Sequence, residues 1–357
     1  MPDSVQTPPH FAREARGHPL HTRMLEIELR QGAPGKFDVR GTILDLRKQG
    51  FIPAGADLQV SGIIHHMEIR ASIDGASRVI EKLESSQPVV AFEASGATAG
   101  EGCRDIADRL GGLVGKVLDA RFAQVLSEIF GGPRGCSHLL TLAHVIGSSV
   151  PHALAWEEEL MGVSEAIRER GERLFKRSLF LDGMESDAGR KLDVVVQSND
   201  IHSLPAAKVV SPVDRFLRQH EVRLLVGIDL ESMTVVSAGG EERERNAANL
   251  VADGWQSRDS ELAALEGKPA LHGLAREVLA NFSGTFPATP LRDALLFIAP
   301  GVIQCLAANA QRLLESAGRS SDDAPAIAHV GGMPDSCYLW RRGGPGQGQG
   351  GLWDNED

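Results

Sequence analysis

Two cysteines in the first half of the chain stand where protein thiols often bind metal. Cys103 follows Gly100 to Gly102 at the start of a predicted helix, and Cys136 follows Gly135 at the start of another. Free amides at a helix N-terminus favour the thiolate, the form that binds metal or attacks an electrophile. Cysteine is also among the most often buried residues, so each one taken alone is explained equally well as a core side chain. The presence of two cysteines in this position favours a metal-binding or reactive site.

Histidines accompany both cysteines. His138 lies two residues after Cys136, where it would either ligate a metal or act as a general acid or base near neutral pH. In the strand predicted over 62–74, alternation places His65 on the apolar face and His66 on the charged face. His65 is therefore either a ligand or a hydrogen-bonded core histidine, and His66 is a further candidate ligand.

The predicted ligand types, thiolate and imidazole, suit Zn²⁺ or Fe²⁺. The candidate ligands are His65, His66, Cys103, Cys136 and His138. Four protein ligands would close the site and make it structural, whereas three would leave a position for water or substrate. Glu68 becomes an acid or base if the second half of the chain covers its face. Arg134, in the loop before Cys136, either meets an anionic substrate or is a solvated loop residue.

The chain repeats itself at a spacing of 155 positions, the difference between His65 and His220. The same spacing superposes Lys36-Phe37-Asp38-Val39 on Lys191-Leu192-Asp193-Val194, Asp45 on Asp200, and Leu140 on Leu295. The retained aspartates favour a structural turn or cap. The second copy has Arg258 in place of Cys103 and Leu291-Arg292-Asp293 in place of Cys136-Ser137-His138. Duplicated folds keep what packing needs, so these differences point to chemistry in the first copy.

Each copy reads as strands followed by helices, which predicts an α+β fold of two homologous halves, each an antiparallel sheet followed by helices. Expected strands are near Arg23 and at 37–46, 62–74, 89–93, 192–198 and 221–229; expected helices are 105–110, 117–130, 136–146, 153–176, 242–253, 260–265, 271–282 and 291–315. The halves are expected to pack as a pseudo-dimer, with two independent domains as the alternative. The division is 20–150, a connecting helix 151–177, a degenerate repeat 178–342 and a disordered tail 343–357.

The composition limits the kinds of partner that the protein is expected to bind. A net charge of −11 over 357 residues argues against nucleic acid, which requires clustered lysine and arginine. Four cysteines and a polar N-terminus predict a cytoplasmic protein. The apolar stretch 294–310 is interrupted by Pro300 and Gly301 and reads as a buried helix, so no membrane partner is expected. No glycine-rich phosphate motif indicates a nucleotide cofactor. Whether the chain forms a homo-oligomer is left open.

Several segments resemble an uncharacterised bacterial domain family known only as a domain of unknown function. They are Arg23, Asp45, 63–70, Gly102-Cys103, 135–140 and 335–340. The order of elements also resembles, more distantly, the NifU/IscU-type iron–sulfur scaffold fold, which binds metal through three cysteines and an aspartate. In that resemblance Cys103 and Cys136 match the second and third cysteines, and Ile63 and His65 replace the strand-end cysteine and aspartate. This replacement favours a mononuclear metal.

These observations predict a metal-dependent enzyme that acts on a small organic substrate by a hydrolytic, hydration or lyase step. A substrate pocket between the two halves is expected, because ligand sites favour domain interfaces. Two other functions stay open: an iron–sulfur or sulfur-transfer accessory protein, and a non-catalytic binding or assembly module. Cys305 reads as a core residue, and Cys337 has no assigned role.

Overall fold

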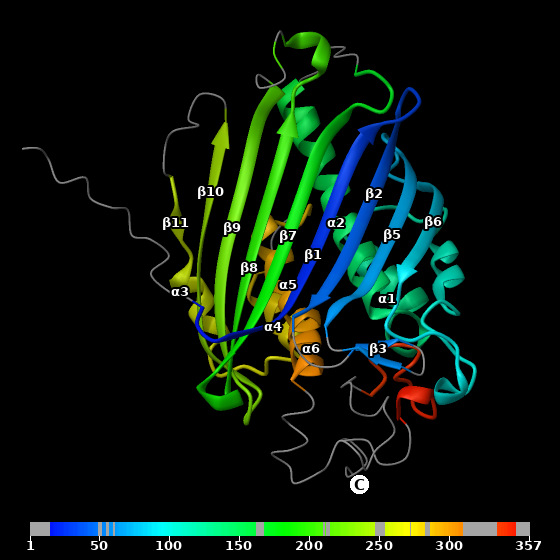
Figure 1. Cartoon of the computed structure of the whole chain (residues 1–357). Helices are drawn as coiled ribbons and strands as arrows, with labels where there is room; N and C mark the ends of the chain where they lie inside the picture. The colour runs from blue at the N-terminus through cyan, green and yellow to red at the C-terminus, as the bar shows by residue number, and fades with distance from the viewer. Residues whose placement is uncertain are drawn as a thin grey trace, which may run out of the picture.

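The computed structural model describes residues 15–48, 52–54, 57–59, 61–161, 168–209, 211, 215–246, 254–271, 273–282, 286–309 and 334–347. Within these ranges the chain forms one large antiparallel sheet with helices against one face (Figure 1). Residues 348–357 of the predicted tail lie outside the described residues, and residues 345–347 form a short 3-10 helix.

The sheet has the strand order β11-β10-β9-β8-β7-β1-β2-β5-β6. Its strands are β1 (His18–Gln31), β2 (Lys36–Arg47), β5 (Gly62–Asp74), β6 (Ile80–Val89), β7 (Arg173–Ser186), β8 (Lys191–Ser203), β9 (Phe216–Asp229), β10 (Thr234–Asn246) and β11 (Gln256–Ser257). A separate hairpin consists of β3 (Ile52–Ala54) and β4 (Asp57–Gln59). The central pair, β1 and β7, joins the two parts of the chain into one continuous sheet.

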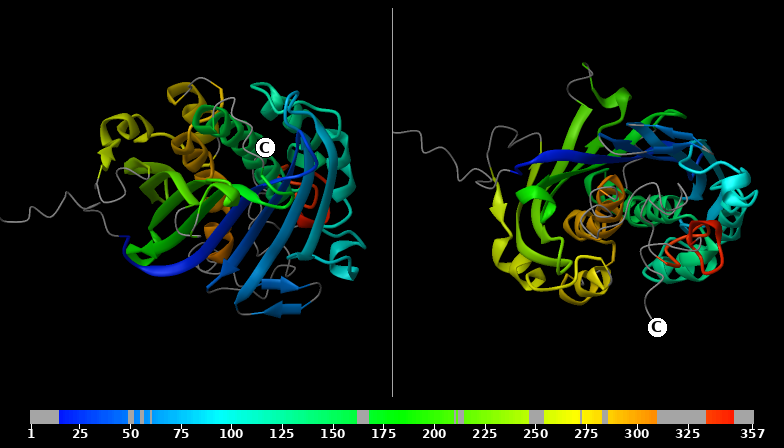
Figure 2. Two further views of the ribbon diagram at one scale, coloured as in Figure 1. Left: turned by 90° about the horizontal axis from the view of Figure 1, so that it is seen from above. Right: turned by 60° about the horizontal axis from the view of Figure 1, so that its bottom comes forward.

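The helices lie on the concave face of the curved sheet (Figure 2). They are α1 (Phe122–Phe130), α2 (Ser137–Met161), α3 (Asp259–Leu262), α4 (Leu274–Asn281), α5 (Pro290–Leu296) and α6 (Ile298–Ala308), with the 3-10 helix η2 (Ala107–Leu113) before α1. Helix α2 packs on β1, β2 and β5, α5 packs on β8 and β9, and α6 packs on β1 and β7.

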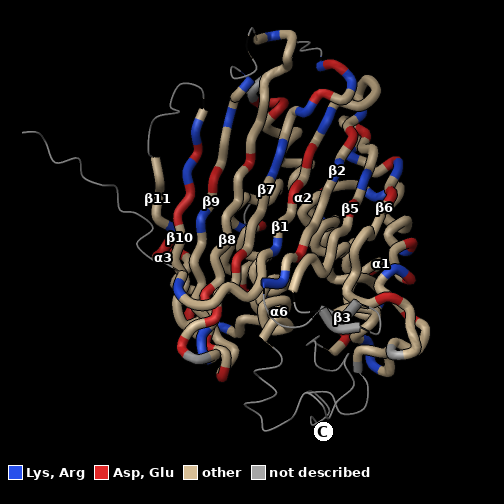
Figure 3. Tube along the Cα trace, in the orientation of Figure 1, with Lys and Arg blue, Asp and Glu red and all other residues tan. Residues whose placement is uncertain are grey.

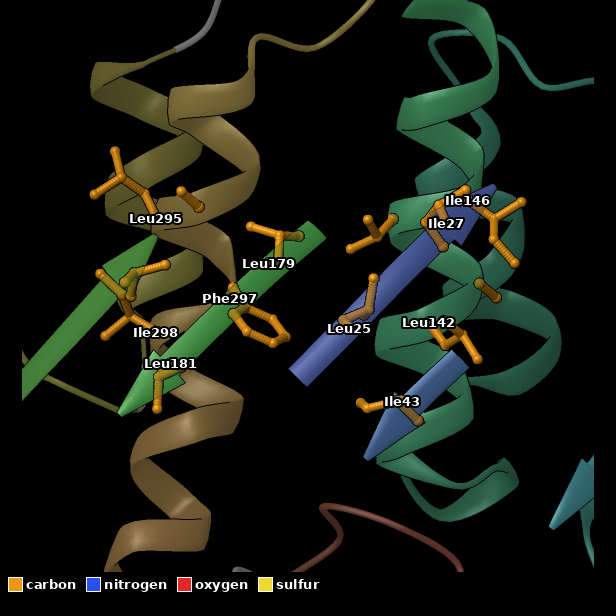
Figure 4. Packing of buried hydrophobic residues seen from close by; sticks show 14 of the residues in the cluster. Leu25, Ile27, Ile43, Leu142, Ile146, Leu179, Leu181, Leu295, Phe297 and Ile298 are labelled. Atoms are coloured by element: carbon orange, nitrogen blue, oxygen red, sulfur yellow. The ribbon is translucent and has the colours of Figure 1, made fainter. Parts of the chain in front are cut away.

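Two-residue alternation explains which face of the sheet is covered. On β1, Leu25, Ile27 and Leu29 are fully buried, and they point toward the helices. Figure 4 shows Ile27 and Ile43 beside Leu142 and Ile146 of α2. The burial of these aliphatic side chains supplies the main force that holds α2 to the sheet.

Charged residues of both signs lie on neighbouring strands of the sheet (Figure 3), and alternation along the strands directs Glu26, Arg40 and Glu68 to the face opposite the helices. Glu68 on β5 forms ion pairs with Arg40 of β2 and with Arg70 of its own strand. Glu26 of β1 pairs in the same way with Lys176 of β7. Such cross-strand pairs stabilise a solvent-facing sheet surface modestly.

The α+β class and the antiparallel meander β1-β2-β5-β6 are confirmed. The helix predicted at 242–253 is wrong in its first part, because residues up to Asn246 belong to β10. The charged run there resembles a helix surface, but its arginines pair across the strands: both Arg243 and Arg245 bind Glu221 of β9. Residues 247–253 lie outside the described residues.

Three other boundaries differ from the predictions. The connecting helix ends early, since α2 ends at Met161 and β7 begins at Arg173. Strand β6 spans Ile80–Val89 where a strand was predicted at 89–93. The helix predicted at 105–110 is the 3-10 helix η2. In each case the local sequence has only a weak secondary-structure preference. Hydrogen bonds to a neighbouring strand, or the geometry of a local turn, determine the structure instead.

Two segments, Ser137–Glu159 and Pro290–Ala308, are long and apolar enough to cross a membrane by length and composition. Inside the protein, however, 72% and 61% of their most apolar windows are buried. They contain α2 and the α5–α6 pair, the helices that cover the sheet. Their apolar character is thus accounted for by packing in the core.

The approach of α6 to the sheet depends on a glycine. A Cβ atom built on Gly183 of β7 would lie 2.1 Å from the Sγ atom of Cys305 on α6. We expect Gly183→Ala to lower the free energy of unfolding by about 1–3 kcal/mol, because it overpacks this contact. Urea denaturation measures the change. Gly111→Ala is the control, because no heavy atom lies within 4 Å of its added Cβ.

A double variant separates this clash from general effects of alanine. If the Sγ atom is the obstacle, adding Cys305→Ala to Gly183→Ala recovers part of the lost stability, with a coupling energy of about 0.5–3 kcal/mol. Additive losses in the two single variants would contradict the close packing of α6 on β7.

Candidate functional site

A buried aspartate connects the polar residues at one end of the apolar sheet face. Asp45 of β2 is fully buried, and the strand register places Arg23 of β1 directly opposite it. Arg23 donates from Nε to Oδ1 at 2.7 Å and from Nη2 to Oδ2 at 2.9 Å. The Nε2 atom of His21 lies 2.8 Å from the same Oδ1. Asp45 is therefore held in a fixed orientation by a bidentate ion pair.

Two further histidines converge on the second oxygen of Asp45. His65 of β5 is the register partner of Asp45, and its Nδ1 lies 3.3 Å from Oδ2. His138, in the first turn of α2, places Nε2 3.1 Å from that oxygen. The two imidazole rings stack with centroids 3.7 Å apart. All three side chains are buried. Neither Nδ1 of His65 nor Nε2 of His138 forms a hydrogen bond of good geometry.

These three residues form a group with the composition of a metal site. One ligand atom from each of Asp45, His65 and His138 lies within 4.8 Å of the other two. Among the described residues, no comparable group includes a cysteine. The structure thus brings together two of the predicted ligands, His65 and His138, with an aspartate that sequence analysis had read as structural.

The charges at this site are set by burial and by Arg23. Burial opposes ionisation of Asp45, but Arg23 and the surrounding histidines hold its pKa well below the usual range. Burial, with His65 nearby, lowers the pKa of His138 to about 3, and burial also lowers the pKa of His65. Both imidazoles are therefore neutral at physiological pH, which is the form that ligates metals.

A small pocket opens beside this group, with a cavity volume of about 70 Å³. Its lining includes Arg47, Ile64, His65, Ala91, Phe92, Cys103, Ile106, Gly135, Cys136, Ser137, His138, Ile303, Gln304, Ala307 and the C-terminal residues Ser336 to Trp340. Residues of β2, β5 and the start of α2 meet residues of α6 and of the C-terminal segment here. Its volume is sufficient for a few water molecules or a small organic molecule.

Three cysteines line the pocket: Cys103, Cys136 and Cys337. The Sγ atom of Cys136 lies 3.8 Å from Nδ1 of His138 and 3.9 Å from Sδ of Met67. Burial raises the pKa of Cys136 to about 12 and raises that of Cys103 well above its usual range. Desolvation therefore outweighs the effect of the helix N-terminus beside Cys136, and Cys103 lies in a turn before η2.

The other predicted site residues lie elsewhere. His66 follows His65 on β5 and so points to the opposite face of the sheet. Glu68 is on that same outer face, where it is buried and forms ion pairs with Arg40 and Arg70. Arg134 donates to the carbonyl oxygen of Ser127 at 2.8 Å, which makes it a local loop residue.

Sequence reasoning missed Asp45, Arg47 and Cys337 as residues of the site. A signal for Asp45 was available, since it interrupts the apolar face of a predicted strand. Cys337 gave no local signal, because its position depends on the backbone contact from the amide of Tyr338 to the carbonyl oxygen of Gly135, 2.8 Å long. Contacts between residues so distant in the chain are invisible to pattern analysis.

Residues 21–150 match a family model described as a protein of unknown function, DUF2889. The matched part runs from β1 into α2, and it contains Asp45, His65, Cys103, Cys136 and His138. Cys337 and the second half of the chain lie outside the match. No curated protein and no solved structure matches this chain. The resemblance to an uncharacterised domain family is thus supported, whereas that to the iron–sulfur scaffold fold stays a prediction.

The Asp45 ion pair generates a stability prediction. Asp45→Asn leaves the Arg23 guanidinium buried without its counter-charge, so the free energy of unfolding should fall by about 3–5 kcal/mol. Chemical denaturation measures it, and Asp38→Asn, at an exposed position of the same strand, is the control expected to change little. The double variant Arg23→Met with Asp45→Leu removes both charges and should recover much of the loss.

The thiol pKa values generate a reactivity prediction. With the pKa of Cys136 raised to about 12, only about one side chain in ten thousand is a thiolate at pH 8. We expect iodoacetamide to modify Cys136 far more slowly in the native protein than in urea, as followed by mass spectrometry of the modified peptide. A native rate at pH 8 equal to the unfolded rate would show an accessible, ionised thiol and contradict the burial.

Proposed function

We propose that the first half of the chain is a metal-dependent enzyme for a small organic substrate, with Asp45, His65 and His138 as the metal ligands. The observation that carries this proposal is the convergence of three buried ligand atoms within 4.8 Å of one another, two of them from His65 and His138, which line a pocket. The two nitrogens that face Asp45, Nδ1 of His65 and Nε2 of His138, are buried without a hydrogen bond of good geometry, which is otherwise costly. A cation between them would satisfy both nitrogens.

Two histidines and one carboxylate suit Zn²⁺ or Fe²⁺, and a metal with only these three protein ligands could also bind water or substrate. Such an ion acts as a Lewis acid or lowers the pKa of a water molecule, which serves hydrolysis, hydration or a lyase step. The residues of this chain would hold the ion, orient it and exclude bulk water. Cys103 and Cys136 would form part of the pocket wall.

The surroundings of Asp45 fit the role of a ligand that is oriented by its neighbours. Its Oδ1 accepts from Arg23 and faces His21, and its Oδ2 accepts from Arg23 while facing the other two histidines. A carboxylate has about four lone-pair positions, so Oδ2 retains one for a cation. Arg23 fixes the ligand as outer partners of metal sites do. Its positive charge would also weaken metal affinity compared with an unpaired carboxylate.

We further infer that the two halves are a duplication packed as a pseudo-dimer, with the site lost from the second half. Asp200 binds Arg177 of the preceding strand through two bonds of 2.7 and 2.6 Å, as Asp45 binds Arg23. At the position of His138 the second half has Asp293, which also binds Arg177. Arg177 is therefore paired with two carboxylates, and no histidine takes the position of His138. This arrangement supports a structural role for the second half.

A second candidate function is metal-free nucleophilic catalysis by Cys136. Its Sγ lies 3.8 Å from His138 Nδ1, and His138 Nε2 lies 3.1 Å from Asp45 Oδ2, which is the order of nucleophile, base and orienting acid. The raised pKa of Cys136 and the lowered pKa of His138 disfavour a preformed ion pair between them. The metal site is therefore the better-supported proposal.

Elemental analysis of anaerobically purified protein tests the proposal. We expect about one zinc or iron per chain in the natural protein and at least a tenfold lower content in His65→Ala and His138→Ala. His220→Ala is the matched control, because it removes the histidine at the repeat position of His65. Cys136→Ser and Cys103→Ser should retain the metal.

Other outcomes would select the alternatives. Loss of metal in the cysteine variants, or a thiolate-to-cobalt charge-transfer band in cobalt-loaded protein, would indicate cysteine ligation and contradict the proposed ligands. Visible absorption after reconstitution with iron and sulfide would indicate a cluster. Absence of stoichiometric metal would contradict the proposed metal site. If Cys136→Ser then abolished an enzymatic activity found in the metal-free protein, that result would favour Cys136 as a catalytic nucleophile.

A further inference from the structure

We propose that the C-terminal segment, residues 334–347, opens and closes over the pocket as a local unit and so controls access to it. The identity of the molecules that enter, a metal ion and a small organic substrate, rests on the proposed function. The opening itself follows from the way in which the segment is attached to the first half, whether or not a metal is bound.

The segment forms one wall of the pocket. Its residues Ser336 to Trp340 line the same cavity as His65 and His138. Figure 2 shows the segment in red beside the helices of the first half. Displacement of the segment would remove this wall and uncover the remaining lining, which includes Cys103 and the two histidines.

The backbone of the segment is hydrogen-bonded mainly to itself. Asp335 donates its amide to the carbonyl oxygen of Trp340 at 2.8 Å, and Trp340 donates to that of Cys337 at 3.1 Å. Among the described residues, one backbone hydrogen bond joins the segment to the rest of the chain, from the amide of Tyr338 to the carbonyl oxygen of Gly135 at 2.8 Å. The segment can therefore separate from the first half and keep its internal hydrogen bonds.

One buried side chain anchors the segment. Leu339 is the only residue of the segment other than glycine that is buried. It packs with Ala91 and Phe92 in a small cluster that is separate from the main core. Release of the segment therefore exposes one aliphatic side chain and leaves the packing of the helices on the sheet intact.

The other links between the segment and the first half are partly exposed. Arg341 binds Glu101 through two hydrogen bonds of 2.7 and 2.6 Å, and the two side chains are 25% and 28% exposed. Such an exposed ion pair contributes little to stability. Tyr338 is half-buried at the edge of the main core, and the ring centroids of Trp340 and Phe92 lie 6.4 Å apart.

These features are those of a region that opens locally. A region with few buried apolar contacts opens at a lower free energy than the whole protein unfolds. Lids that admit ligands to enzyme sites belong to this class of region. The segment thus combines a weak attachment with a position at the pocket.

Three cysteines report on this opening through their rates of alkylation. Cys103 and Cys337 line the pocket and pack on the cluster of Leu339, whereas Cys305 is fully buried in the main core. The rate of iodoacetamide modification in the native protein, divided by the rate for the same tryptic peptide in urea, measures the protection of each thiol. We expect similar protection of Cys103 and Cys337, at least about tenfold lower than that of Cys305.

Variants of the segment assign this protection to its attachment. Leu339→Ala should accelerate the modification of Cys103 and Cys337 at least about tenfold, because it removes the buried anchor. Arg341→Gln should accelerate it about two- to fivefold. Neither variant should change the rate at Cys305.

The matched control is Leu279→Ala, at a leucine of α4 that is 49% exposed, which should change none of these rates. Near-ultraviolet circular dichroism verifies that each variant is folded. Equal acceleration at Cys305 would show that the segment is released only when the whole protein unfolds, and would overturn the proposal. Rates at Cys103 that neither segment variant changes would overturn it as well.

Zinc exchange separates this proposal from the proposed function. In zinc-loaded protein, a chromophoric chelator should remove zinc faster from Leu339→Ala, by the same factor as the alkylation of Cys103 increases. Zinc removal that stays unchanged while alkylation accelerates would overturn the role of the segment in access. A protein that binds no stoichiometric zinc would reject the metal enzyme, and the alkylation rates would still decide whether the segment opens over the pocket.

Discussion

The buried ion pair between Arg23 and Asp45 is the constraint on which the site depends. A carboxylate and a guanidinium withdrawn from water are stable only when paired with good geometry, and here two hydrogen bonds join them. This pairing leaves one side of Asp45 facing His65 and His138. The strand register enforces it, since a slip of one residue would move Asp45 to the outer face of the sheet.

Large apolar packing holds this polar group in place. The inward residues of β1 and β2 fix α2 against the sheet, and the start of α2 then carries His138, with Cys136 directly before the helix, to the end of the strands. Because the histidines are buried by this packing, they remain neutral at physiological pH. The same packing therefore determines both the position of the proposed ligands and their protonation state.

The two parts of the sheet share one buried ion pair and differ in what surrounds it. Both halves bury an arginine paired with an aspartate, which indicates that this pair serves the fold. In the second half Arg177 binds a further carboxylate, Asp293, whereas in the first half a neutral histidine occupies the corresponding place. The second half thus has an ion pair of one arginine with two carboxylates where the first half has an aspartate that faces two histidines.

Local sequence patterns predict the α+β class, the strands β1, β2, β5, β8 and β9, and two of the three proposed metal ligands. Alternation over 37–46 and 62–74 is a local property, so β2, β5 and the inward direction of His65 could be predicted from it. Only the tertiary structure decided that β7 and β10 are strands of one continuous sheet, that Asp45 is shared by four side chains, and that Cys337 reaches the first half. These depend on hydrogen bonds, ion pairs and desolvation between residues far apart in the chain, which no local pattern records.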